Sequence, residues 1–170
     1  MAAARFRIRP AAAADAAAVA GLAAELAQSF AFSLASFDAC YPALLAAGHA
    51  CLLVATAGPE DAGPGYSGPG YSGPEYSGPA DGCLGYLLGF EHLTFYANGR
   101  VAWVEEVLVR GADRGQGAGR ALMTAFEAWA RGRDCALVAL ATRRAAPFYR
   151  ALGYQDSAAY LRKILAGNPG

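Results

Sequence analysis

Lysine and net charge are what this sequence lacks most clearly. Its 14 Lys and Arg residues balance 14 Asp and Glu residues, and its single lysine, Lys163, lies close to the end of the chain. A P-loop needs a lysine directly after its glycines, so the position of Lys163 excludes one. The balanced charge gives no reason to expect nucleic acid or an anionic membrane surface as a partner.

Paired cysteines and long apolar runs are also absent. The four cysteines, at positions 40, 51, 83 and 135, lie singly in apolar surroundings, without the spacing of a metal site or the density of a disulfide scaffold. We therefore expect reduced core thiols and no metal. No apolar run has the length of a membrane span, and the first residues lack the apolar stretch of a signal peptide. These absences predict a cytoplasmic protein that does not bind a membrane.

The length and composition predict one domain with a low-complexity insertion. A chain of 170 residues with 55% hydrophobic residues has the size of one domain and can fill a substantial core. A Gly-Pro-Gly-Tyr-Ser unit repeats through 63–79, and a segment with Gly and Pro in every copy supports neither a helix nor a central strand. We expect a loop insertion at about 57–81. The alternative for its tyrosines is a flap that binds a partner or covers a substrate.

Hydrophobic periodicity predicts alternating strands and helices along the rest of the chain. Asp15 is expected to cap the first helix. The expected strands cover 6–8, 49–56, 83–93, 101–110, 137–140 and 159–165, and the expected helices cover 16–29, 37–47, 117–131 and 144–152. This order predicts an α/β protein whose mixed sheet is covered on both faces.

The most informative segment is a glycine-dense turn between an expected strand and an expected helix. Gly115, Gly117 and Gly119 follow the apolar residues 107–109. Such glycines allow close approach of the backbone, and free amides at a helix N-terminus attract anions. The spacing Gly-x-Gly-x-Gly differs from the Gly-x-Gly-x-x-Gly of dinucleotide-binding proteins. The turn therefore predicts a cradle for another phosphate-containing ligand.

The motif Arg114-x-x-Gly117-x-Gly119 resembles the acyl-CoA-binding motif of the GNAT superfamily of N-acetyltransferases. Residues 145–154, which contain Phe148-Tyr149 and end in Leu-Gly-Tyr, are similar to the second signature of that family. The resemblance implies the GNAT fold. This fold has a central mixed, mostly antiparallel sheet with helices on both faces, and strands four and five splay apart to admit acetyl-CoA.

The resemblance also implies which residues hold acetyl-CoA. The pyrophosphate is expected on the amides of the cradle, with charge-assisted contacts from Arg114 and Arg120. The pantetheine arm is expected along the strand, and Thr142 stands where the family usually has an asparagine that bonds this arm. The complete set of expected donor-binding residues is Val107, Leu108, Val109, Arg114, Gly115, Gln116, Gly117, Ala118, Gly119, Arg120 and Thr142.

Acetylation of an amine requires a base and an acid. An alkylamine with a pKa of about 10 is protonated at neutral pH, so a base must remove a proton before attack. Strand alternation places Glu105 on one face with Val107 and Val109 and places Glu106 on the other face with Val104 and Leu108. The resemblance favours Glu105 as the base. Tyr149 matches the family's tyrosine that protonates the departing thiolate. The structural alternatives are an ion pair for either glutamate and simple packing for Tyr149.

The acceptor side is less well defined by the sequence. We expect Glu106, with Phe32 and Tyr41 from the second helical region and His92 and Tyr96 near the turn at 94–99, to contact the acceptor. The predicted activity is transfer of the acetyl group of acetyl-CoA to a primary amine of a small molecule by direct attack. The alternatives are acetylation of a peptide or protein N-terminus and a non-catalytic acyl-CoA-binding module. The resemblance also makes a homodimer an expectation.

Overall fold

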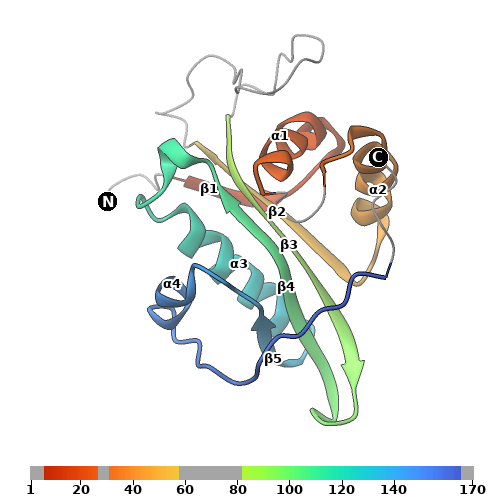
Figure 1. The fold of residues 1–170 in the computed structure, drawn as a ribbon, viewed down its shortest axis with the longest axis vertical. Helices are drawn as coiled ribbons and strands as arrows, with labels where there is room; N and C mark the ends of the chain where they lie inside the picture. Colours follow the sequence, from red (N-terminus) through yellow and green to blue (C-terminus); the bar gives the residue numbers. More distant parts are fainter. Residues whose placement is uncertain (1–5, 27–30, 58–81, 166–170) are drawn as a thin grey trace.

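A five-stranded mixed sheet forms the centre of the protein in a computed structural model, which describes residues 6–26, 31–57 and 82–165 (Figure 1). The strands follow one another in the order of the chain, and the first four are antiparallel whereas the last pair is parallel. They are β1 (Phe6–Pro10), β2 (Ala50–Ala57), β3 (Cys83–Thr94), β4 (Gly99–Val109) and β5 (Cys135–Leu140).

Helices cover both faces of this sheet. The first two, α1 and α2, pack on one face, and α3 packs on the other (Figure 1). The helices are α1 (Ala16–Leu26), α2 (Leu34–Ala46), α3 (Ala118–Arg131) and α4 (Ala146–Arg150), with single 3₁₀ turns η1 (Ala13–Asp15) and η2 (Gly111–Asp113). The mixed sheet and its two helical layers confirm the expected fold class.

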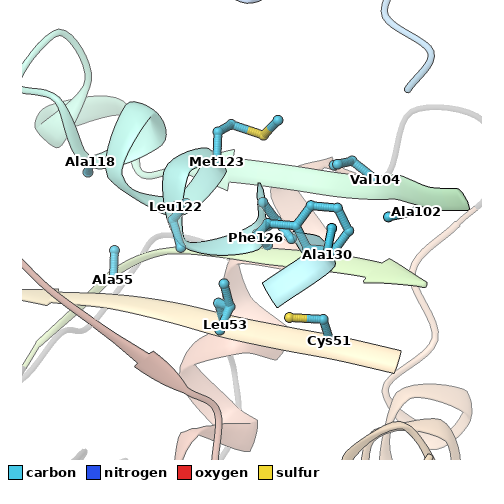
Figure 2. Packing of buried hydrophobic residues seen from close by; sticks show 11 residues of the cluster. Cys51, Leu53, Ala55, Ala102, Val104, Ala118, Leu122, Met123, Phe126 and Ala130 are labelled. Carbon is cyan, nitrogen blue, oxygen red and sulfur yellow. The ribbon is translucent and has the colours of Figure 1, made fainter. Parts of the chain in front are cut away.

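The core on the α3 face is formed by a stripe of apolar residues on α3 that packs against the sheet. Leu122, Met123, Phe126 and Ala130 recur at helical spacing on α3 and are all buried. They lie over alternate residues of the strands beneath, among them Leu53 of β2 (Figure 2). Since side chains on the alternate positions of β2 point the other way, a second core forms under α1 and α2.

Gly89 of β3 is required by the close approach of α3. A Cβ atom at this position would lie 2.5 Å from the ring of Phe126 and 2.8 Å from the carbonyl oxygen of Trp103. The register of β3 and β4 shifts at the same place, between Leu88 and Gly89. Gly89 therefore allows the Phe126 ring to pack closely on β3, and it lies where the pairing of β3 with β4 is irregular.

Several predicted element boundaries require correction. The expected strand at 159–165 is wrong: the backbone there has no regular secondary structure, and Leu161 and Leu165 are each 89% exposed. An apolar pattern makes a strand only where a sheet edge is available to pair with it.

Cys40 is exposed on α2 and is not a core thiol. The predicted insertion at 57–81, apart from its first residue, and the last residues of the expected first helix lie outside the described residues.

Asp15 does not cap α1 with its carboxylate as expected. The carboxylate accepts a hydrogen bond from the backbone N–H of Ala12 at 2.7 Å and forms two bonds of 2.7 Å with the guanidinium of Arg9. Asp15 is 1% exposed. Burial by itself raises the pKa of this carboxyl, but the bonds to Arg9 and Ala12 outweigh burial and lower it from 3.8. Asp15 therefore joins the start of α1 to β1.

Replacement of Asp15 by Asn is expected to lower the free energy of unfolding by about 2 kcal/mol at neutral pH, because a buried charged pair loses one partner. The lowered pKa of Asp15 means that its contribution is complete above the unfolded value of 3.8 and disappears as the pH falls through the folded value. Urea unfolding at pH 7 and pH 3 measures both effects. The difference between wild type and Asp15→Asn should shrink at pH 3, whereas Asp38→Asn, on the exposed side of α2, should change stability little at either pH.

Candidate active site

A bulge in β4 places the two adjacent glutamates in different environments. Leu88 of β3 lies opposite Glu106, and Gly89 lies opposite Val104, so Glu105 has no residue opposite it. The bulge breaks the expected alternation. Val104 packs in the core under α3, whereas Leu108 packs in the core under α1 and α2. The expectation that Glu106, Val104 and Leu108 share one face is therefore wrong for Val104.

The two glutamates differ in exposure and contacts. Glu105 is exposed, and its carboxylate forms no hydrogen bond or ion pair with any residue that the structure describes. Glu106 is half-buried, and one of its oxygens, Oε2, accepts a hydrogen bond of 2.6 Å from the hydroxyl of Tyr86. Because Tyr86 and Leu88 both belong to the core under α1 and α2, Glu106 lies on that face of the sheet. Neither glutamate pairs with an arginine within the described part of the chain.

The pairing of β4 with β5 stops at the bulge. Val104 and Leu140 are the last pair of the parallel ladder, and β4 continues for five more residues, to Val109. Along this stretch β4 has no further strand partner on the β5 side within residues 6–26, 31–57 and 82–165. The backbone edge between the bulge and the end of β4 is therefore open to a ligand that binds as an extra strand.

The register shows which backbone groups this edge presents. The N–H of Arg110 donates to the carbonyl of Leu84 at 2.8 Å, which makes these two residues a hydrogen-bonded pair. Hydrogen-bonded and non-hydrogen-bonded pairs alternate in an antiparallel ladder, so Val109 and Val107 direct their polar backbone groups away from β3. The backbone of Leu108, which was expected to help bind pantetheine, points towards β3. The open edge is thus formed by Val107 and Val109.

The N-terminus of α3 adjoins the end of β4. Gly117 is the N-cap residue with φ 101°, and Gly115 has φ 75°, both in the region that favours glycine. The first intrahelical bond runs from the N–H of Ala121 to the carbonyl of Gly117, which leaves the amides of the first turn without helical partners. A Cβ atom on Gly119 would lie 3.7 Å from a side-chain carbon of Val109. The amide cradle and the open strand edge therefore meet.

Polar side chains form hydrogen bonds with the backbone that leads into the cradle. The Nε of Arg114 donates to the carbonyl of Val109 at 2.9 Å, and the amide of Gln116 donates to the carbonyl of Ala112 at 3.3 Å. Arg120 is exposed and forms no ion pair with the described residues. Two guanidinium groups thus lie at the same helix terminus as the free amides. Together these groups suit a ligand with several negative charges.

Tyr149 lies on the same side of the sheet as α3. It packs against the core under α3 and meets the rings of Phe148 and Tyr154 edge-on. Burial raises the pKa of its phenol above the ordinary value of 10.0. Phe148, the other aromatic residue of the second signature, lies 3.4 Å from the Cβ position of Gly119 and so joins α4 to the cradle. The hydroxyl oxygen of Thr142 accepts from the N–H of Ala145 at 3.1 Å and holds the turn before α4.

The residues expected around the acceptor do not all come together. His92 lies opposite Val101, and Tyr96 lies in the turn at the tip of the β3–β4 hairpin and is 71% exposed. The tip projects away from the cradle (Figure 1). Tyr41 is a core residue whose hydroxyl donates to the carbonyl of Ala12 at 2.8 Å. Phe32 is 37% exposed and contacts Phe37, which stacks on Tyr41. Of the expected set, Glu106 alone lies beside the open edge.

Within 6–26, 31–57 and 82–165, no group of three His, Cys, Asp or Glu side chains is arranged to hold a metal ion. None of the helices in these ranges combines the length and hydropathy needed to cross a membrane.

Known proteins resemble this chain in sequence pattern and in fold. The sequence model of the Acetyltransferase (GNAT) family matches residues 74–154. No curated protein is a significant match to the sequence. Among solved structures, an acetyltransferase of Trypanosoma brucei is 20% identical with a TM-score of 0.70, and 94% of this chain covers 99% of that one.

Two further structures are named for the amines that they acetylate. Glucosamine-6-phosphate N-acetyltransferase from Arabidopsis thaliana is 15% identical with a TM-score of 0.72, over 95% of this chain and 99% of that one. The aminoglycoside N-acetyltransferase AAC(6')-Iy in complex with CoA is 17% identical with a TM-score of 0.71, over 94% of this chain and 93% of that one. The family match spans β3, β4, the cradle and α4, which are the elements that form the site. Residues 74–154 thus match the sequence model of the GNAT acetyltransferase family, and the chain has the fold of solved acetyltransferases.

Proposed function

We propose that this chain, as a single domain in the cytoplasm, transfers the acetyl group of acetyl-CoA to a primary amine of a small molecule by direct attack. The observation that supports this proposal best is the meeting of an open strand edge with a free helix N-terminus. The edge is formed by Val107 and Val109, and the helix terminus carries the amides from Gly117 to Arg120. A long ligand with an amide-containing arm and a pyrophosphate matches both features.

The donor supplies an acyl group activated as a thioester. Bound across the cradle, it lies against α3 and α4 on one face of the sheet, so the amine must approach from the face of α1 and α2. Glu106 lies on that face. A cationic amine is attracted there by the two carboxylates of β4, Glu105 and Glu106, which no described arginine neutralises.

The chemistry divides between two side chains. Glu105 accepts a proton from the ammonium group of the acceptor, and the free amine then forms a C–N bond as the C–S bond of the thioester breaks. Tyr149 donates its phenolic proton to the departing sulfur, and the second proton that the nitrogen releases as the amide forms restores the phenol. Burial supports this role, because a raised pKa keeps the Tyr149 phenol protonated at neutral pH. No residue carries the acetyl group between donor and acceptor.

The function is tested by thiol release from acetyl-CoA in the presence of a panel of primary amines. The panel contains 1,4-diaminobutane, neamine, glucosamine 6-phosphate and a short peptide with a free N-terminus. We expect release with at least one small amine and a thermal shift with acetyl-CoA alone. A thermal shift without release on any member of the panel would identify a binding module, and preferential release with the peptide would favour N-terminal acetylation.

Replacement of Tyr149 by Phe is expected to lower kcat about 10-fold. The effect is moderate for an acid catalyst because a thiol with a pKa of about 8.5 is a fair leaving group even without a proton donor. The Kd of acetyl-CoA should stay within about twofold of wild type, since the ring and its edge-on contacts remain. Tyr160→Phe, at a residue that is 63% exposed, is the matched control. Equal kcat values for the two variants would remove Tyr149 from the reaction.

A further inference from the structure

Tyr86 is a polar residue in an apolar setting. It lies in the first half of β3, is 1% exposed, and packs with Val54, Leu88 and Leu108 in the core under α1 and α2. A phenylalanine would fill the same space without a polar atom to satisfy. A buried hydroxyl without a partner is costly, so the presence of one indicates that its hydrogen bond is used.

The partner of this hydroxyl is the carboxylate of Glu106. The hydroxyl of Tyr86 donates to Oε2 at 2.6 Å, the short distance of a charge-assisted bond. Burial, together with the negative charge of Glu106, raises the pKa of the Tyr86 phenol far above its ordinary value. The phenol therefore keeps its proton at neutral pH, and the bond runs from Tyr86 to Glu106. The second carboxylate oxygen, Oε1, forms no hydrogen bond with any described residue.

The position of Glu106 connects this bond to the site. Glu106 comes directly after the bulge and directly before Val107, the first residue of the open edge. It lies on the face opposite α3 and α4, which is the face left for the acceptor. A flexible glutamate loses rotamer freedom when it binds a cation, and a hydrogen bond from a rigid core residue removes that freedom in advance.

We propose that Tyr86 is a positioning residue that fixes the carboxylate of Glu106 to bind the ammonium group of a cationic amine acceptor. This inference rests on the proposed function and specifies its substrate class. Amines with a second positive charge are the preferred acceptors, because one charge is lost when the attacking nitrogen gives up its proton and the other remains to pair with Glu106. An amine that also carries a phosphate is a poor acceptor, because two carboxylates repel it.

The experiment is a double-mutant cycle on steady-state kinetics with 1,4-diaminobutane and glucosamine 6-phosphate as the two probes. Wild type, Tyr86→Phe, Glu106→Gln and the double variant are compared. We expect Tyr86→Phe to raise the KM for 1,4-diaminobutane about 10-fold, with kcat and the KM for acetyl-CoA little changed. In the Glu106→Gln background, the same substitution should have no further effect on that KM, because the carboxylate that Tyr86 positions is gone.

Tyr154→Phe is the matched control. The hydroxyl of Tyr154 donates to Oε1 of Glu127 at 3.0 Å, so this variant loses the same kind of bond at another place. Both variants should lose some thermal stability, but Tyr154→Phe should leave the KM for 1,4-diaminobutane unchanged.

The outcomes separate this inference from the function on which it rests. Wild-type release of thiol with unchanged KM in Tyr86→Phe would overturn the inference and leave the function in place. Equal effects of Tyr86→Phe in the presence and absence of Glu106 would also overturn it, because they would show a purely structural role. Wild-type enzyme that releases no thiol with any amine would overturn both.

Discussion

Acetyl-CoA is expected to bind about 100-fold more weakly to Gly117→Asp than to Gly117→Asn. Gly117 has φ 101° at the N-cap of α3, a conformation that Asn and Asp tolerate better than other residues. Among the described residues, a Cβ atom there would meet only the ring of Phe6, at 3.8 Å, which is an ordinary contact. The two variants therefore differ chiefly by one negative charge, placed where the pyrophosphate is proposed to bind.

The magnitude follows from charge repulsion near the protein surface. Two unit charges at about 4 Å repel each other by roughly 1 kcal/mol in water and roughly 4 kcal/mol at an effective dielectric constant of about 20. A loss of about 2.7 kcal/mol corresponds to the expected 100-fold change in Kd. Isothermal titration with acetyl-CoA measures both Kd values.

The same substitution should have the opposite effect on the helix. A carboxylate at an N-terminus stabilises the macrodipole, so Gly117→Asp should be at least as stable to heat as Gly117→Asn in the absence of ligand. Lower affinity together with equal or greater stability cannot come from misfolding. Equal Kd values for the two variants would place the pyrophosphate away from this helix terminus.

Replacement of Glu105 by Gln is expected to lower kcat/KM for the amine about 100-fold at pH 7. The substitution keeps the shape of an exposed side chain, so folding and acetyl-CoA affinity should change little. What it removes is the base that takes a proton from an ammonium group.

The loss in Glu105→Gln should be recovered at high pH. The fraction of free amine in solution rises about 10-fold per pH unit below its pKa of about 10, so the variant should gain rate steadily up to that pH. Burial raises the pKa of the Tyr149 phenol above its ordinary value of 10.0, which favours its role as a proton donor as the pH rises. A pH profile parallel to that of wild type would show that Glu105 is not the base, and Glu106 would be tested next.

The layout of the fold could be predicted from the sequence because it depends on local patterns. The apolar stripe of α3 and the glycines before it indicate a helix N-terminus directly after a strand. The turn at Asn98 and Gly99 was also predictable, since Asn98 has φ 54° and this conformation favours asparagine among non-glycine residues.

The details of the site could not be predicted because they depend on register. The bulge at Glu105 changes the face of every residue before it relative to those after it, and nothing in 104–108 signals an extra residue. The bond between Tyr86 and Glu106 joins residues 20 positions apart in sequence and depends on that register. A tyrosine inside an apolar strand pattern is its only local sign. For His92 and Tyr96, the sequence indicated a hairpin but not that its tip would project away from the site.

Residue-resolved amide hydrogen exchange with and without saturating acetyl-CoA tests the central claim most directly. The claim is that the donor binds as an extra strand on the open edge of β4 and on the free amides of α3. We predict increased protection at Val107, Val109 and the first turn of α3, and no change at Leu108, whose backbone already pairs with Tyr86. Protection of Leu108 equal to that of its neighbours, or none along 105–110, would contradict this account.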